Sequence, residues 1–276
     1  MRIYVLALDE VFDTGLSTVL DTLSIANDLA ESAGTPSIHF EVTVVGVRRR
    51  VHTSQGLSVP VVAAAQLAHP DIVLIPALGA KMPETLQVAL ERRDVADAGE
   101  LLQQWADSGA LVSAACTGTF VLANTSLLDG HSATTSWWLA PLFRERYPRV
   151  ILEESRMVVG SSSFITAGAA LAHIDLALWL VRRSSPALAA MTARYLVIDP
   201  RPSQAIFMIP DHLIHTDPLV ERFEQWARYR LTEGFSLNAA ASATGASERT
   251  LARRLKTVLG KTPAFLFSGS SCRARS

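Results

Sequence analysis

Short apolar segments alternate with amphipathic ones through the first two thirds of the chain, and this rhythm constrains the fold more than any other feature. Four segments predict strands because they are short and rich in β-branched and aliphatic residues: Arg2–Leu8, His39–Val47, Asp71–Pro76 and Ala110–Ala115. In Asp71–Pro76 the apolar residues follow one another without alternation, which is typical of a strand that is covered on both faces.

The segments around these strands predict helices. Val19, Leu23, Ala26 and Ala30 recur at the spacing of one helical face. We expect helices over five segments: Val19–Ala33, Leu86–Ser108, Thr117–Leu128, Ala167–Arg183 and Ser184–Leu196. Strands separated by helices in this order favour an α/β fold, with a parallel sheet that helices cover on both sides.

Length and composition narrow the class of protein. With 276 residues, 49% of them hydrophobic and 18% charged, the chain suits two ordinary domains or one large one. No apolar run reaches the roughly 18 residues of a membrane span, and the apolar N-terminus stops at Asp9, too early for a secretory signal. Cys116 and Cys272 form neither a disulfide framework nor a metal cluster. We therefore expect a cytoplasmic protein without membrane association, metal or cofactor.

Charge is distributed unevenly along the chain. Residues 1–233 carry 18 Lys and Arg against 25 Asp and Glu, whereas residues 234–276 carry 7 against the single Glu248. A basic segment behind an acidic body is typical of a chain that meets a polyanion, and equally of a solubilising tail. Charge alone leaves both interpretations open.

A strand-to-helix junction at Cys116 is the first candidate functional site. Ligands of parallel sheets bind at the carboxyl ends of strands, and a residue on so sharp a turn points into that crevice. The following helix N-terminus is expected to stabilise a thiolate, while Gly118 permits close backbone approach. The alternative is a small buried cysteine that acts as a hydrophobic side chain.

The basic tail is the second candidate, because it has the pattern of a helix–turn–helix. Leu237–Thr244 predicts a short Ala-rich helix, Gly245 suits its end, and Ser247 caps a second helix that runs to about Leu259. This second helix has one apolar stripe and one basic stripe: Leu251, Leu255 and Val258, and Arg249, Arg253 and Lys256. Such a helix fits a DNA-recognition helix; the alternative is a solvated basic face.

The body resembles a known superfamily at several separated motifs. AACTGTFVLA and SLLDGHSATTSWWLAPLFRERYP, with DIVLIPALG and TAGAALAHIDLALWLV, resemble the ThiJ/PfpI superfamily over about residues 1–196, and most of all the sensor domain of GlxA-type transcription regulators. The resemblance implies a flavodoxin-like three-layer α/β/α sandwich, usually dimeric. It also implies an effector pocket at the strand-to-helix turn of Cys116 and Thr117, which we call the elbow. Asp13, Gly79 and Ser136 are expected to lie nearby in this pocket.

Catalysis by Cys116 would need a base and an orienting acid beside the thiol. Thr117 stands where enzymes of the superfamily often have histidine, and Gly15 stands where its isocyanide hydratases have an acid. Ser136 follows the Thr134-Thr135 pair where many GlxA-like domains have histidine. We therefore expect a non-catalytic sensor. The alternatives are a Cys-dependent hydratase or amidase with a vestigial tail, and a dimeric binding protein with neither activity.

The tail, from about Ser236 to Pro263, resembles the first helix–turn–helix of the AraC/XylS family. The resemblance implies DNA contacts from the second helix and the residues after it: Ser247, Arg249, Thr250, Arg253, Arg254, Lys256 and Lys261. The family continues with a connecting helix and a second helix–turn–helix, whereas residues 264–276 have no apolar period. This departure implies weakened DNA binding, since affinity depends steeply on the number of phosphate contacts.

Together these features predict a DNA-binding transcription regulator with an unidentified small-molecule effector, dimeric through its α/β domain. The expected organisation is a sensor domain at 1–198, a linker at 199–218 and a partial AraC-type domain at 219–276. Pro200, Pro202, Pro210 and Pro218 indicate the linker.

Overall fold

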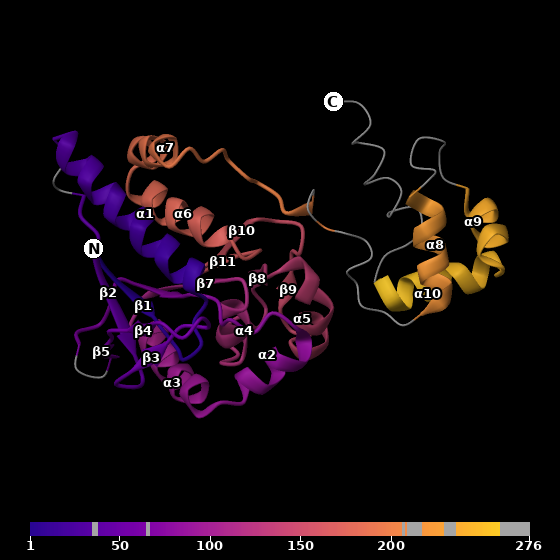
Figure 1. Cartoon of the computed structure of the whole chain (residues 1–276), viewed down its shortest axis with the longest axis horizontal. Helices are drawn as coiled ribbons and strands as arrows, with labels where there is room; N and C mark the ends of the chain where they lie inside the picture. Colours follow the sequence, from indigo (N-terminus) through magenta and orange to yellow (C-terminus); the bar gives the residue numbers. More distant parts are fainter. Residues whose placement is uncertain (35–37, 65–66, 206–207, 209–216, 229–235, 260–276) are drawn as a thin grey trace. The chain divides into compact units, whose positions relative to one another are not determined.

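The protein divides into two compact units, residues 1–207 and residues 208–276 (Figure 1). The computed structural model describes residues 1–34, 38–64, 67–205, 208, 217–228 and 236–259. The division falls within residues 199–218, the segment that its prolines indicate as a linker. Residues 201–205, however, belong to the first unit by their hydrogen bonds, which are described below.

A seven-stranded sheet forms the centre of the first unit, in the order β10-β11-β7-β6-β1-β2-β5. Neighbouring strands are parallel except β10 and β11, which form an antiparallel pair at one edge. The strands are β1 (Arg2–Leu6), β2 (Glu41–Gly46), β5 (Val62–Ala63), β6 (Ile72–Ile75), β7 (Leu111–Ala115), β10 (Val158–Ser161) and β11 (Phe164–Ala167). Two small sheets pair β3 (Val51–His52) with β4 (Ser58–Val59) and β8 (Ser132–Ala133) with β9 (Ile151–Leu152).

Helices cover both faces of this sheet, because alternate residues of its strands bury toward opposite sides. Ile3 and Val5 of β1 pack into a core with α1 (Asp13–Ser32), α6 (Ala172–Ser184) and α7 (Pro186–Tyr195). Tyr4 and Leu6 pack into the other core, which the remaining helices of the unit share: α2 (Pro83–Leu90), α3 (Arg93–Asp107), α4 (Gly118–Ala123) and α5 (Ala140–Arg146). Figure 1 shows α1, α6 and α7 above the sheet and α2 and α3 below it. The predicted three-layer flavodoxin-like fold is confirmed.

Several predicted helix boundaries are wrong. Helix α1 begins at Asp13 rather than Val19, because Thr14 and Gly15 join the helix without adding to its apolar period. The helix predicted over Leu86–Ser108 is broken at Arg92, whose backbone is extended (ψ 147°). The helix predicted over Thr117–Leu128 ends at Ala123, where turns begin.

The antiparallel edge of the sheet is the largest departure from the sequence prediction. The helix predicted from Ala167 begins at Ala172, because residues 164–167 form strand β11. Strand β11 pairs with β7 on one side and with β10 on the other. Both strands have four residues, and Gly160 and Ser161 interrupt the apolar pattern of β10.

The second unit has three described helices: α8 (Pro218–Arg228), α9 (Leu237–Thr244) and α10 (Glu248–Leu259). Predicted helix Leu219–Leu231 corresponds to α8, and residues 229–235 lie outside the described residues. The predicted bounds of α9 are confirmed, with Gly245 in the left-handed region (φ 70°). One small core joins the three helices: Val220, Phe223, Ala240, Ala241, Leu251 and Leu255.

Two further properties concern the described residues of both units. Among them, no helix combines the length and the apolar character needed to cross a membrane. Nor do three or more His, Cys, Asp or Glu side chains gather there in a way that could hold a metal ion.

Candidate functional site: a buried thiol elbow and a basic helix

Cys116 stands on a sharp turn directly between strand β7 and helix α4. Its φ is 55°, a left-handed backbone conformation that residues other than glycine rarely adopt. Its N–H donates to the Ala167 carbonyl at 2.9 Å. A Cβ on Gly118 would lie 2.5 Å from the Ile75 carbonyl oxygen and 2.6 Å from that of Pro76. The turn therefore needs glycine at 118, and it places Cys116 at the carboxyl end of the sheet, as the nucleophile-elbow pattern predicts.

The Cys116 thiol is buried and remains protonated at neutral pH. Its Sγ lies 2.7 Å from Ser136 Oγ, and the Thr135 hydroxyl donates to the Cys116 carbonyl at 2.7 Å. Burial raises the pKa of the Cys116 thiol, and hydrogen bonds from Ser136 and Thr117 oppose that rise without cancelling it. Desolvation, the largest influence on this pKa, thus acts against the expected thiolate.

His173 is a fully buried core histidine whose two ring nitrogens have backbone partners. Ala77 N–H donates to its Nε2 at 3.0 Å, and its Nδ1 lies 2.6 Å from the Ala170 carbonyl oxygen. Desolvation lowers its pKa to about 4, so the ring is neutral near pH 7. A Cβ on Gly15 would lie 2.5 Å from Nε2. The ring thus occupies the space beside position 15, where the related hydratases were expected to carry an acid.

Asp13 holds a neighbouring loop in place. Its Oδ2 accepts from the Ser54 hydroxyl at 2.8 Å and from the Gln55 N–H at 3.2 Å. Burial opposes its charge, but hydrogen bonds from Thr53, Ser54 and the backbone prevail and lower its pKa. A Cβ on Gly79 would lie 2.2 Å from Ser54 Cβ, so Ser54 connects the two predicted pocket residues Asp13 and Gly79.

The five predicted pocket residues fall into two groups. Cys116 and Ser136 touch through their side chains, and Thr117 donates to the Leu78 carbonyl at 2.9 Å, next to Gly79. Asp13 and Gly79 both contact Ser54. A surface cavity of about 480 Å³ near Tyr147 is lined by none of the five. They therefore surround a buried elbow rather than that open cavity.

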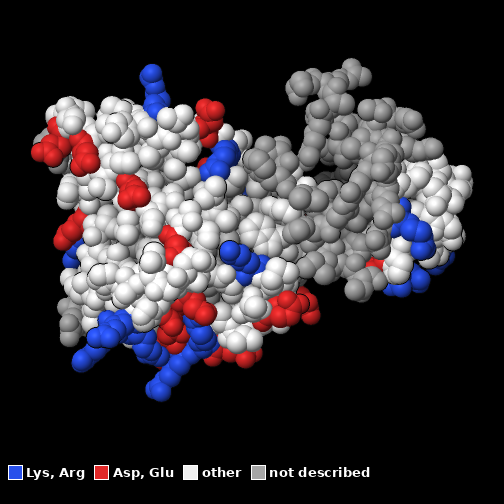
Figure 2. All heavy atoms as spheres, in the orientation of Figure 1, with Lys and Arg blue, Asp and Glu red and all other residues white. Residues whose placement is uncertain are grey.

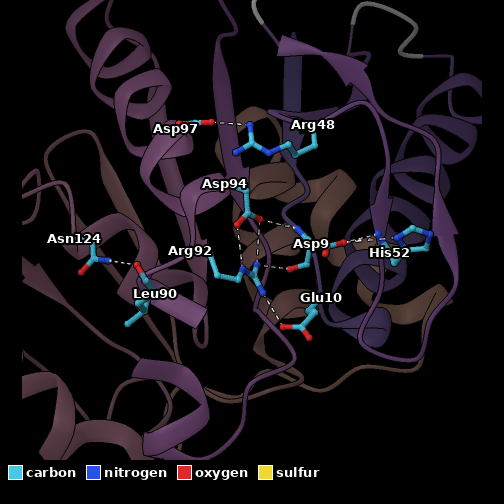
Figure 3. Close-up of polar contacts among 9 residues, drawn as sticks. All are labelled: Asp9, Glu10, Arg48, His52, Leu90, Arg92, Asp94, Asp97 and Asn124. Carbon is cyan, nitrogen blue, oxygen red and sulfur yellow. Dashed lines mark hydrogen bonds and ion pairs between the residues drawn. The ribbon is translucent and has the colours of Figure 1, made fainter. Parts of the chain in front are cut away.

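An ion-pair network fixes the loop between β1 and α1 (Figure 3). The Arg92 guanidinium binds Asp94 at 3.0 Å, Glu10 at 2.7 Å and the Asp9 carbonyl at 2.6 Å. Asp94 Oδ2 also accepts from the Asp9 N–H at 3.1 Å. Glu10 has a φ of 56°, so Arg92 secures a strained turn just before Asp13. These residues lie about 80 positions apart in sequence, and nothing in their local pattern signals the contact.

Helix α10 presents cations on one side and buries its apolar stripe on the other. Leu251 and Leu255 are fully buried, whereas Arg249, Arg253 and Lys256 are exposed. Blue atoms gather on the visible surface of the helical unit (Figure 2). The predicted two-sided character of this helix is therefore present.

The other predicted DNA-binding residues have different surroundings. Ser247 caps α10, since its Oγ accepts from the Thr250 N–H at 3.2 Å and lies 2.8 Å from Thr250 Oγ1. Arg254 pairs with Asp217 at 3.3 Å, so its guanidinium also holds α10 to the start of α8. Lys261 lies outside the described residues.

The central sheet has helices on both faces, and a cysteine stands on the sharp turn after strand β7. These two features define the class of α/β proteins that the sequence motifs resemble. The chain belongs to the DJ-1/PfpI family, whose model matches residues 1–183.

Curated relatives extend the similarity beyond this family model. The HTH-type transcriptional regulator GbdR of Pseudomonas aeruginosa is 24% identical over 262 residues, 94% of this chain and 68% of GbdR. The HTH-type transcriptional regulator ArgR of the same species is 30% identical over 169 residues, 60% of this chain and 51% of ArgR. These relatives confirm the resemblance to GlxA-type regulators and favour a regulator over the enzyme alternative.

Solved structures agree on the fold. An AraC family transcriptional regulator from Pseudomonas putida superposes with a TM-score of 0.58 at 20% identity, covering 71% of this chain and 98% of that one. DJ-1beta of Drosophila melanogaster gives a TM-score of 0.56 at 19% identity, covering 72% and 98%. At these identities the likeness establishes the α/β fold alone.

Proposed function

We propose that the protein is a sequence-specific DNA-binding transcription regulator in which α10 enters the major groove. The observation that carries this proposal is the two-sided helix: Leu251 and Leu255 anchor it while Arg249, Arg253 and Lys256 remain exposed. Arg249 and Arg253 reach bases or phosphates, and Lys256 adds attraction to the backbone. The names of the curated relatives support the same function.

The α/β unit acts, in this proposal, as a non-catalytic sensor of a small-molecule effector. In the described part of the chain Cys116 Sγ lies beside the Ser136 hydroxyl, and a neutral hydroxyl is too weak a base to take the thiol proton. Burial also raises the pKa of that thiol, which opposes nucleophilic chemistry at the elbow.

The proposal includes dimerisation through the α/β unit, which brings two α10 helices to one DNA site. Two helices double the phosphate contacts, and affinity rises steeply with their number. Sedimentation of the full chain tests this part: a monomer at micromolar concentration contradicts it.

A titration of labelled duplex DNA at low salt tests the assigned helix face. We expect Arg253→Ala to weaken binding and to reduce the salt slope by about one charge, because one phosphate or base contact is lost. Arg194→Ala, at the end of α7 in the other unit, is the matched control and should leave binding unchanged. Equal affinities for the Arg253→Ala variant and the unmodified chain would refute the assigned face.

A further inference from the structure

The last described segment of the α/β unit, residues 201–205, is anchored before the chain continues toward the helical unit. The Arg201 guanidinium pairs with Asp175 of α6. The Gln204 N–H donates to the Ser155 carbonyl at 2.9 Å. The segment that joins the two units therefore starts from a fixed position on the α/β unit.

Gln204 is the deepest point of this anchor, since its side chain is fully buried. Its Nε2 faces four acceptors: the Glu154 carbonyl at 2.8 Å, the Thr135 carbonyl at 2.9 Å, and Thr134 Oγ1 and the Arg156 carbonyl at 3.3 Å each. Because every partner is an acceptor, the amide group must present its NH₂ here. A Cβ on Gly168 would lie 2.5 Å from Nε2, so this glycine leaves the space that Gln204 fills.

The segment that receives Gln204 also holds the elbow. Thr135 accepts from Gln204 through its carbonyl and donates through its hydroxyl to the Cys116 carbonyl at 2.7 Å. The next residue, Ser136, lies 2.7 Å from Cys116 Sγ. A displacement of residues 134–136 by an occupant of the elbow would therefore disturb both sets of hydrogen bonds together.

The Gln204 anchor is also short of one hydrogen bond. Its Oε1 is buried and has no partner among the described residues. An unsatisfied buried acceptor carries a desolvation cost, which reduces the stability of the docked segment relative to a released one. The segment is thus suited to switch between two arrangements in response to a small change at its contacts.

We infer that Gln204 couples the packing around Cys116 to the anchoring of residues 201–205, so that effector binding at the elbow releases the connection to the DNA-binding helices. Gln204 is a positioning residue in this scheme, because it acts through Thr135. The coupling is reciprocal: release of the segment must loosen the elbow as much as opening of the elbow loosens the segment. The regulatory consequence rests on the proposed function, whereas the coupling itself does not involve DNA.

Thiol labelling tests the coupling in one direction. The full chain carries Cys272→Ser so that methyl methanethiosulfonate reports on Cys116 alone. We expect Gln204→Met, which keeps the side-chain length but removes the hydrogen bonds, to speed labelling of Cys116 about tenfold. The matched control is Gln103→Met in α3, which removes a side-chain hydrogen bond to the Thr125 carbonyl outside this segment and should leave the labelling rate unchanged.

Hydrogen exchange tests the reverse direction with native Gln204 in place. Thr135→Val removes the hydroxyl that binds the Cys116 carbonyl but keeps the backbone carbonyl that binds Gln204. We expect exchange of the amides of residues 203–205 to rise about tenfold, while exchange in β6 stays at its original rate.

The two measurements decide the inference even if one variant fails to fold. Faster labelling in Gln204→Met but not in Gln103→Met, or faster local exchange in Thr135→Val, supports the coupling. Unchanged rates in both measurements, or equal acceleration of labelling by Gln103→Met, overturns it. Neither readout requires DNA, so a failure of DNA binding would be recognised separately.

Discussion

At the scale of single residues, burial decides what Cys116 can do. The elbow geometry that usually exposes a nucleophile is present, yet the thiol faces Ser136 and its pKa is raised by desolvation. The space that an acid would need at position 15 is taken by His173. The described residues thus give Cys116 the backbone of an elbow, with a hydroxyl beside its thiol.

Alkylation of Cys116 tests this view of the thiol. In the Cys272→Ser background we expect the rate with iodoacetamide to be slow at pH 7 and still rising above pH 9, because the thiolate forms only above its usual pKa. The second-order rate constant is measured from pH 6 to pH 10. A rate that levels off below pH 7 would show a thiolate and would restore the enzyme alternative.

His173 makes the α/β unit sensitive to acid. Its pKa is about 4 in the folded chain and about 6.5 when unfolded, so the unfolded chain binds the extra proton between these values. We therefore expect the contribution of His173 to stability to be complete above about pH 6.5 and to fall as the pH drops toward 4, by on the order of 3 kcal/mol. Urea unfolding of the full chain between pH 7.5 and pH 4.5 measures the loss.

A matched variant isolates the contribution of this histidine. His173→Gln lacks the titrating ring, so the free energy of its unfolding should depend less on pH between 6.5 and 4. The lowered pKa of Asp13 acts below its usual value of 3.8 and does not enter this window. Parallel pH profiles for the two chains would contradict the assignment.

At the scale of elements, Asp217 connects two helices of the helical unit. Its Oδ1 accepts from the N–H groups of Leu219 and Val220 at the start of α8, at 2.9 and 3.2 Å. Its Oδ2 binds Arg254 of α10. One carboxylate thus caps α8 and fixes the orientation of the basic helix.

Removing this carboxylate should loosen the helical unit. We expect Asp217→Ala to destabilise it by about 1–2 kcal/mol, the usual cost of a lost N-cap, measured as faster amide exchange in α8 and α10 of the full chain. Arg254→Met removes only the half-exposed ion pair and should cost less than about 1 kcal/mol. Equal effects of the two changes would show that the cap contributes nothing.

The sequence predicts those elements whose own residues determine them. Strands β6 and β7 are continuous apolar runs because both faces are covered, and the turn after α9 follows from Gly245. Strand β10 is interrupted by Gly160 and Ser161, and the sequence pattern assigns the last residue of β11, Ala167, to the following helix. The elbow itself follows from the strand–Cys–Thr–Gly order, because that pattern is local.

Contacts between distant residues could not be read from the sequence. Gly15 meets His173 and Gly168 meets Gln204 only because the sheet brings their elements together. The Thr134-Thr135 pair was the sequence signal for the segment that packs against Cys116. It did not reveal that Gln204 also binds this pair. Likewise, the protonated thiol depends on burial, which a motif does not encode.

At the scale of the whole molecule, we propose that the DJ-1/PfpI unit senses an effector and that the helical unit binds DNA. The first unit supplies a buried elbow, and the second supplies an exposed basic helix. Residues 201–205 are held on the α/β unit through Gln204 and lie on the chain that leads to the helical unit. We propose that the α/β unit influences the helical unit through this segment. The central claim is that α10 of this chain selects particular DNA sequences.

Selection of duplexes from a random-sequence pool by the full chain tests that claim most directly. We expect repeated rounds to enrich a common motif, and the double change Arg249→Ala with Arg253→Ala to abolish the enrichment while the α/β unit remains folded. A pool that stays random with the unmodified chain, or a motif that the double variant enriches equally, would contradict the account.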